Sequence, residues 1–164
     1  MLEIGQAIGL YCSDVSGAFD RVRQERIMMK LRGSGFDKRV VDFLESWLRD
    51  RRFVVLVSGA VTSEKPLRNS VYQGTVLGPP LWNLFYEDAA LATRLLEFIE
   101  VIFADDYNCW RGYSAAKSNE EILAQCRLCQ ASLHRWGEAN SVKFDPAKES
   151  FHVLHRTRGS GGGV

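Results

Sequence analysis

Residues 98–110 read FIEVIFADDYNCW and place two acidic side chains between two apolar runs. The runs Phe98 to Phe103 and Tyr107 to Trp110 are short and rich in β-branched and aromatic residues, which is typical of strands. Only the Ala-Asp-Asp sequence at 104–106 separates them. The segment therefore predicts a tight pair of strands with the two acids held at its tip.

Apolar spacing and turn residues predict the elements on either side of this strand pair. They are a strand at 4–12, a helix from Asp20 to Leu31, a helix at 37–50, a hairpin with runs at 53–57 and 61–67, a helix at 81–96, a helix opened by the capping box Ser118-x-x-Glu121, and a strand at 150–155. Hairpins, rather than single parallel strands, separate the helices. The expected class is α+β, with a mainly antiparallel sheet and helices packed on one face.

The composition indicates one domain of ordinary size, because 46% of the 164 residues are hydrophobic and 25% are charged. A net charge of +1 argues against a polycation that holds nucleic acid by bulk charge. No apolar run approaches the roughly 18 residues of a membrane span, so we expect an intracellular protein without a membrane partner. Residues 1–157 are the expected domain, and the glycine-rich residues 158–164 are the expected flexible tail.

A third acid, Asp14, follows the first predicted strand. If that strand lies beside the 98–110 pair, Asp14, Asp105 and Asp106 converge, and hard divalent cations such as Mg²⁺ would relieve their mutual repulsion. Two such ions about 4 Å apart assist in-line phosphoryl displacement. The alternative is that Asp14 caps a turn and that the other two acids are ordinary turn residues.

Four motifs, taken in chain order, resemble those of one enzyme family. Asp14 to Asp20 (DVSGAFD) is similar to the first palm motif of reverse transcriptases, and Gln73 to Leu81 (QGTVLGPPL) is similar to their Q-G-S-V-L-G-P motif. Phe103 to Asp106 (FADD) resembles the catalytic turn of non-LTR retrotransposon and group II intron enzymes, and the stretch from Trp136 to Lys148 resembles the segment that follows it. The resemblance implies a polymerase palm fold.

The resemblance implies RNA-directed DNA polymerase activity, a nucleotidyl transfer from a dNTP to a primer 3′-OH. The partners it implies are an RNA template and a DNA primer. Carried over residue by residue, it assigns two Mg²⁺ ions to Asp14, Asp105 and Asp106, with the Val15 carbonyl as a further ligand. It assigns the protonation of the pyrophosphate leaving group to Lys148, for which the alternative is a solvated lysine.

Three further positions match residues that contact the nucleotide in this family. Phe19 matches the bulky residue under the sugar that excludes a ribose 2′-OH, although a core phenylalanine is the alternative. Gln73 and Gly74 match the residues beside the incoming nucleotide and the template base, where glycine allows close backbone approach.

The sequence also departs from the family pattern. Tyr72, Asp145 and Glu149 replace the usual proline, asparagine and threonine. Only 13 residues precede Asp14, so we expect a fragment that lacks the fingers and thumb of a larger polyprotein and has little activity alone. Whether the chain is an enzyme stays open: the alternative is a noncatalytic palm-like remnant that serves as a nucleic-acid or protein scaffold. As part of a retrotransposon, the chain is expected in the nucleus.

A further alternative is a palm-related nucleotide cyclase or nucleotidyl transferase, which would keep paired acids. This alternative does not account for the motif at 73–81. The segment 21–52 has ten basic and five acidic residues, a net charge of +5 that suits a nucleic-acid backbone or a solvated helix surface.

Cys126, Cys129 and His134 match three ligands of a zinc knuckle, but the fourth position falls on Ala139. Because both cysteines lie on an apolar helix stripe, we predict structural thiols without metal.

Overall fold

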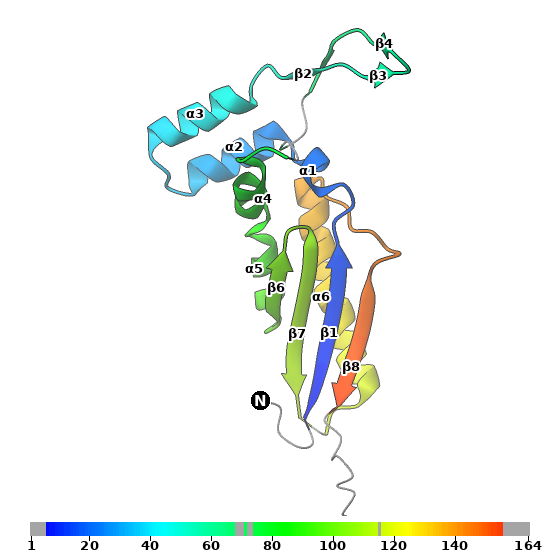
Figure 1. Cartoon of the computed structure of the whole chain (residues 1–164). Coiled ribbons are helices and arrows are strands. Elements are labelled where there is room, and N and C mark those ends of the chain that lie inside the picture. The colour runs from blue at the N-terminus through cyan, green and yellow to red at the C-terminus, as the bar shows by residue number, and fades with distance from the viewer. Residues whose placement is uncertain (1–5, 68–70, 72–73, 115, 156–164) are drawn as a thin grey trace, which may run out of the picture. The chain divides into compact units, whose positions relative to one another are not determined.

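The acidic turn lies at one end of a four-stranded antiparallel sheet with the strand order β6-β7-β1-β8 (Figure 1). The structure is a computed structural model that describes residues 6–67, 71, 74–114 and 116–155. The strands of this sheet are β1 (Ala7–Asp14), β6 (Ile99–Phe103), β7 (Asp106–Tyr113) and β8 (Ser150–His155). The prediction for 150–155 is confirmed, whereas β1 runs on to Asp14, beyond the end predicted at residue 12.

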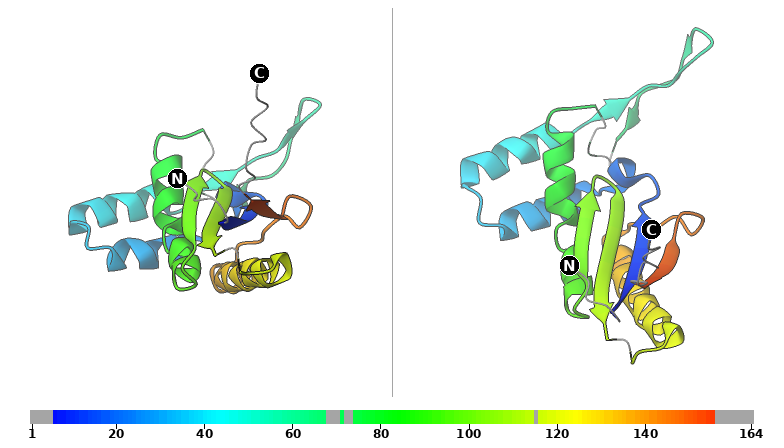
Figure 2. Two further views of the ribbon diagram at one scale, coloured as in Figure 1. Left: turned by 90° about the horizontal axis from the view of Figure 1, so that it is seen from below. Right: turned by 60° about the horizontal axis from the view of Figure 1, so that its bottom comes forward.

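Helix α6 (Asn119–Asn140) packs on one face of this sheet and runs along it (Figure 2). The predicted capping box opens it: the Ser118 amide donates to Glu121 Oε2 at 2.8 Å, and the Glu121 amide donates to Ser118 Oγ at 3.3 Å. The helix lies so close to β1 that a Cβ on Gly9 would stand 2.6 Å from Ile122 Cγ2. Glycine at this position therefore sets the distance between strand and helix.

The single helix predicted at 81–96 is wrong, because the structure has two, α4 (Gly78–Tyr86) and α5 (Ala89–Arg94). Prolines occupy the first turn of α4, where a missing amide hydrogen is tolerated, so this helix begins earlier than predicted. Trp136 Nε1 on α6 donates to Asp88 Oδ1 at 2.8 Å, a contact between distant residues at the break between the helices. Helix α5 joins the same face as α6, since Thr93 Oγ1 on α5 hydrogen-bonds Tyr107 Oη below β7 at 2.5 Å.

A second group of elements is built from helices and a narrow β-ribbon. Its members are α1 (Ala18–Arg21), α2 (Gln24–Gly33), α3 (Lys38–Leu48), β2 (Arg52–Phe53), β3 (Leu56–Val57), β4 (Ala60–Val61), β5 (Lys65–Pro66) and α4. The predicted hairpin at 53–67 is thus two short strand pairs, β2 with β5 and β3 with β4. The predicted start of a helix at Asp20 is wrong, because Gly17 (φ 63°) already begins α1, and extended Val22 then separates α1 from α2.

These groups correspond to two compact units, and the single domain expected from composition stays a prediction. Contacts assign Met1–Ser16, Asp88–Ala139 and Lys143–Val164 to the sheet unit, and Gly17–Glu87 with Asn140–Val142 to the helical unit. The division arises because apolar side chains gather in two places, beneath the sheet in one unit and among α2, α3 and α4 in the other. Within the described part of the chain, no helix has the length and apolarity needed to cross a membrane.

Candidate active site

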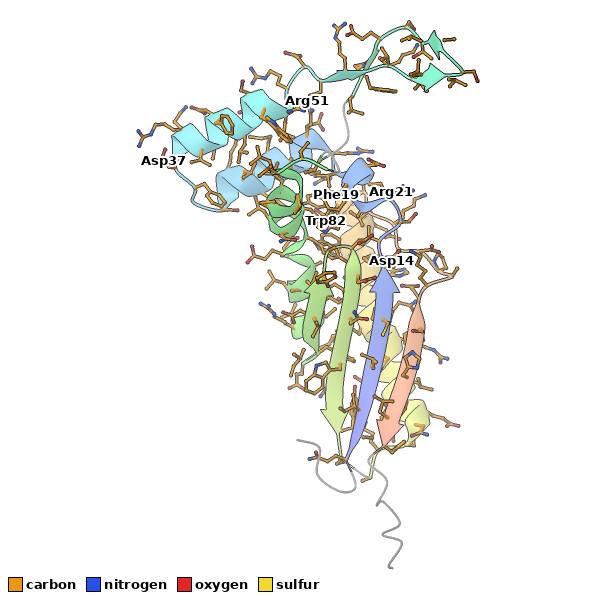
Figure 3. All side chains as sticks on the ribbon, viewed as in Figure 1. Asp14, Phe19, Arg21, Asp37, Arg51 and Trp82 are labelled. Atoms are coloured by element: carbon orange, nitrogen blue, oxygen red, sulfur yellow. The ribbon has the colours of Figure 1, made fainter. Side chains whose placement is uncertain are left out.

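Two of the predicted acids face each other across neighbouring strands. Asp14, the last residue of β1, is paired in register with Asp106, the first residue of β7. Residues directly opposite in an antiparallel pair project from the same face of a sheet, so these carboxylates share the end of one face. Figure 3 shows Asp14 at the end of β1. Only 11% of the Asp14 side-chain surface is exposed, so a nearby opposite charge offsets the free-energy cost of burying this carboxylate.

Asp105 lies in the two-residue turn that joins β6 to β7, beside the pair formed by Asp14 and Asp106. The Val15 amide donates to the Asp105 carbonyl at 3.2 Å, which ties the turn to the end of β1. Ala104, the other turn residue, has φ 54°, a left-handed conformation that costs a residue with a Cβ about 1 kcal/mol or more. Contacts with neighbouring residues, such as the hydrogen bond from Val15, must therefore hold the turn in this conformation.

Lys148 reaches the site from the loop before β8. Its ammonium lies 2.7 Å from Asp14 Oδ2, and this hydrogen bond, together with the Asp14 charge, raises the pKa of Lys148 above its ordinary value. Lys148 is therefore protonated at neutral pH. Sequence reasoning selected Lys148 only through the resemblance, and the structure places it against a predicted metal ligand.

The loop that carries Lys148 is tied to β1 at the backbone as well. The Asp145 amide donates to the Asp14 carbonyl at 2.9 Å, and the Ala147 amide donates to Asp145 Oδ1 at 3.0 Å. A side-chain oxygen two residues before an amide makes this turn, and asparagine carries an equivalent oxygen. Asp145 in place of the family's asparagine therefore leaves the turn intact.

Glu149 is the residue that sequence reasoning recorded only as a departure from the family. Its carboxylate accepts hydrogen bonds from Tyr11, Ser13, Gln130 and His134, and its side chain is 7% exposed. Burial raises the pKa of Glu149, but these hydrogen bonds outweigh burial and leave the pKa below its ordinary value. The spacing of Gln130 and His134, four residues apart on one helix face, is the sequence signal that could have suggested a shared partner.

Carboxylate oxygens are the donors that hard divalent cations prefer, and Asp14 and Asp106 are register partners next to the Asp105 turn. Among the described residues, no three His, Cys, Asp or Glu side chains are gathered closely enough to hold a metal ion. In this structure the Lys148 ammonium forms an ion pair with the Asp14 carboxylate. The Val15 backbone lies next to these acids, and the two-ion site stays a prediction.

Two of the remaining predicted residues, Phe19 and Gly74, belong to the helical unit. Phe19 on α1 is half-buried, and its ring centroid lies 5.5 Å from that of Trp82, a contact that Figure 3 shows. Gly74 is exposed with φ 85°, a conformation that favours glycine. Gln73 lies outside the described residues. The ring contact of Phe19 agrees with packing and does not test the nucleotide role.

Much of the charge in the segment 21–52 is paired within the segment itself. Glu45 accepts from Arg32 and from Arg49 at 2.8 Å each, and Lys38 lies 2.6 Å from Asp42. The pairs Lys38–Asp42 and Glu45–Arg49 have the i,i+4 spacing of a solvated helix. These contacts favour the surface interpretation over a groove for nucleic acid.

The Cys126 and Cys129 thiols of α6 are buried in the core, as expected for cysteines on an apolar helix stripe. Cys126 and Cys129 are fully buried, and Cys129 Sγ lies 3.3 Å from Cys109 Sγ on β7. Burial raises the pKa of Cys126 to about 11, so its thiol is protonated at neutral pH. His134, the third residue of the zinc-knuckle pattern, hydrogen-bonds Glu149 instead.

Comparison with solved structures identifies the fold. Apo telomerase from Candida tropicalis, truncated from its C-terminal domain, aligns with 92% of this chain and 31% of its own, with a TM-score of 0.67 and 12% identity. Telomerase from Candida albicans in complex with a telomeric RNA fragment aligns with 92% of this chain and 27% of its own, with a TM-score of 0.60 and 14% identity. The fold, with acids at the end of an antiparallel sheet, is that of a polymerase palm.

A family model described as reverse transcriptase (RNA-dependent DNA polymerase) matches residues 2–157, and the chain belongs to this family. It is 30% identical over 166 residues to the RNA-directed DNA polymerase from mobile element jockey of Drosophila melanogaster, covering 96% of this chain and 17% of that protein. It is 33% identical over 91 residues to the Pol polyprotein from type-1 retrotransposable element R2 of Popillia japonica, covering 56% of this chain and 15% of that protein. The relatives are of the non-LTR retrotransposon type.

Proposed function

We propose that this chain is the catalytic palm of an RNA-directed DNA polymerase that adds a dNTP to the 3′-OH of a primer on an RNA template. The observation that carries the proposal is the pairing of Asp14 with Asp106, beside a turn in which the Asp105 carbonyl accepts from Val15. The chain spans less than a fifth of the length of the jockey polymerase. The polymerase activity of that whole protein is therefore only proposed for this chain.

Asp14, Asp105 and Asp106, with the Val15 carbonyl, would hold two Mg²⁺ ions. When bound, two such ions stabilise the attacking and leaving oxygens of an in-line displacement. The family generally uses divalent metals, and carboxylates at the end of a sheet are suitable oxygen donors. To receive an ion, the three carboxylates would have to move closer together, and the strand ends and the tied turn keep their residues at one end of the sheet.

Lys148 would act on the leaving group. In the transfer, the primer 3′-OH gives its proton to water as its oxygen forms a bond to the α-phosphorus of the dNTP, while the bond from that phosphorus to pyrophosphate breaks. The departing pyrophosphate takes a proton from the Lys148 ammonium, which has a raised pKa and lies at the same end of the sheet as Asp14. The lysine returns to its starting state by taking a proton from water.

The resemblance supports nucleotide-binding roles for Phe19, Gln73 and Gly74. Phe19 would contact the sugar and reject a ribose 2′-OH by steric exclusion. Gln73 and Gly74 would lie beside the incoming nucleotide and the template base. The left-handed backbone at Gly74 disfavours residues that have a side chain, which supports this role for glycine.

A magnesium titration tests the proposed site directly. We expect Mg²⁺ to shift the backbone NMR signals around Asp14, Asp105 and Asp106, and we expect Asp105→Asn to weaken the apparent affinity at least severalfold by removing a charged ligand. Asp50→Asn is the matched control, because Asp50 is an exposed turn residue with φ 55°, a conformation that asparagine tolerates.

Two outcomes would refute the magnesium site. One is a titration without shifts at these residues, and the other is an Asp105→Asn variant that binds as tightly as the Asp50→Asn control. Either result would favour the alternative of a noncatalytic palm that serves as a scaffold.

A further inference from the structure

Glu149 connects the underside of the sheet to the loop that carries Lys148. Glu149 Oε1 accepts from the hydroxyls of Tyr11 and Ser13, two residues of β1 whose side chains point toward α6. From α6, Gln130 Nε2 donates to Oε2 at 2.8 Å, and His134 Nε2 lies 2.7 Å from Oε1. One carboxylate thus joins a strand, a helix and the loop before β8.

Lys148 and Glu149 are neighbours in the chain, yet their side chains have different surroundings. The Glu149 side chain is 7% exposed among polar groups beneath β1, whereas the Lys148 side chain is 60% exposed and contacts Asp14. Lys148 closes the turn before β8, because its amide donates to the Asp145 carbonyl at 3.0 Å, and Glu149 follows it directly. Fixing the Glu149 side chain beneath β1 therefore restrains the end of this turn, from which the Lys148 side chain extends to Asp14.

The same loop has a second attachment to α6. The His134 ring stacks on Phe144, with centroids 5.2 Å apart and planes 9° from parallel. The Phe144 backbone forms a β-bridge with Val15, next to Asp14. His134 thus contacts both ends of the loop that carries Lys148, at Phe144 and at Glu149.

We propose that Glu149 is a positioning residue: its buried hydrogen bonds hold the start of β8 so that the Lys148 ammonium lies against Asp14. Threonine, the frequent family residue here, is too short to accept from two strand hydroxyls and two helix side chains together. The catalytic meaning rests on the role proposed above for Lys148. The positioning itself concerns only this chain's side chains.

The Lys148 ammonium provides a direct readout in the absence of metal and nucleotide. Ammonium protons of freely solvated lysines exchange rapidly with water, and a hydrogen bond to a carboxylate slows that exchange. A ¹⁵N–¹H correlation spectrum of the lysine side chains should therefore show a slowly exchanging Lys148 signal, assigned by its loss in Lys148→Met. If the wild-type chain shows no such signal, the lysine is not held and the proposal is wrong.

Four variants separate positioning from general destabilisation. Glu149→Ala should abolish the Lys148 signal, and the conservative Glu149→Gln, which keeps an oxygen for Tyr11 and Ser13, should retain it. Gln130→Ala removes one remote donor to Glu149 and should speed exchange severalfold. Ser132→Ala is the matched control on α6, since it removes a 2.7 Å hydrogen bond to the Ala92 carbonyl and does not contact Glu149.

An unchanged Lys148 signal in folded Glu149→Ala would overturn the proposal. If Glu149→Ala does not fold, Gln130→Ala decides: faster exchange supports positioning, and exchange equal to that in Ser132→Ala refutes it. Because no metal is present, this result is independent of the magnesium titration. A chain with a held lysine that binds no Mg²⁺ would refute the proposed function and leave the positioning role of Glu149 standing.

Discussion

The Lys148 ammonium and a metal ion compete for the same oxygen atoms at Asp14. In this structure Lys148 lies 2.7 Å from Asp14 Oδ2, so it occupies one direction from which an ion would approach the carboxylate. An ion at Asp14 must displace or share this contact. The lysine that would serve the leaving group therefore also limits metal affinity.

We expect Lys148→Ala to raise the affinity of the chain for Mg²⁺ by about two- to fivefold, the range that loss of a partly exposed ion pair suggests. Isothermal titration calorimetry measures the change, and Lys117→Ala, at an exposed lysine, is the control. Unchanged or weaker binding in Lys148→Ala would mean that the lysine does not compete with the ion.

The spacing between β1 and α6 depends on one glycine. A Cβ at Gly9 would stand 2.6 Å from Ile122 Cγ2, 3.0 Å from Cys126 Sγ and 3.1 Å from Tyr113 Cε2. Gly112 pairs with Ile8 on the same strand pair, and a Cβ there would meet nothing within 4 Å. Two glycines in one sheet thus have opposite steric surroundings.

Gly9→Ala should lower the free energy of unfolding by about 1–3 kcal/mol, because the added methyl group pushes α6 from the sheet. Gly112→Ala should change it by no more than about 0.5 kcal/mol. Urea unfolding followed by circular dichroism compares the two variants. Equal effects would show that α6 can move away from β1 without cost.

At the scale of the whole molecule, buried polar groups link stability to pH. Glu149 has a pKa below its ordinary value, because hydrogen bonds from Tyr11, His134 and Gln130 outweigh burial. A depressed carboxyl pKa contributes stability that is fully present above the unfolded pKa and is lost as the pH falls through the folded pKa. The free energy of unfolding should therefore decline as the pH falls below about 4.3, the ordinary value for glutamate.

Glu149→Gln should be less stable than the wild type at neutral pH and should show a shallower decline in acid, because its amide does not titrate. Other glutamates with lowered pKa values, Glu45, Glu100 and Glu121, keep part of the decline in the variant. Urea unfolding at a series of pH values between 3 and 7 measures both slopes. Parallel slopes would show that Glu149 is not linked to folding.

Local sequence signals were sufficient for much of the fold and part of the site. The strand pair around the acidic turn, the capping box of α6, the strand at 150–155 and the burial of Cys126 and Cys129 were all predicted, although the turn comprises residues 104–105 and not the predicted 104–106. Each of these depends on residues within one turn or one element, where composition and periodicity act directly. The break between α4 and α5 was missed, because a tertiary hydrogen bond at Asp88 marks it. The start of α1 was missed, because an early turn at Gly17 marks it.

By itself, the sequence determined the family, through four motifs in order, and the chemical nature of the acids that would bind metal. Only the tertiary structure decided that Lys148 lies against Asp14, that Glu149 is a buried acceptor of four side chains, and that Cys109 meets Cys129. Lys148 and Asp14 lie far apart in the chain, and they meet because β1 lies between β7 and β8. Strand order is a property of the packed sheet, and no local periodicity encodes it.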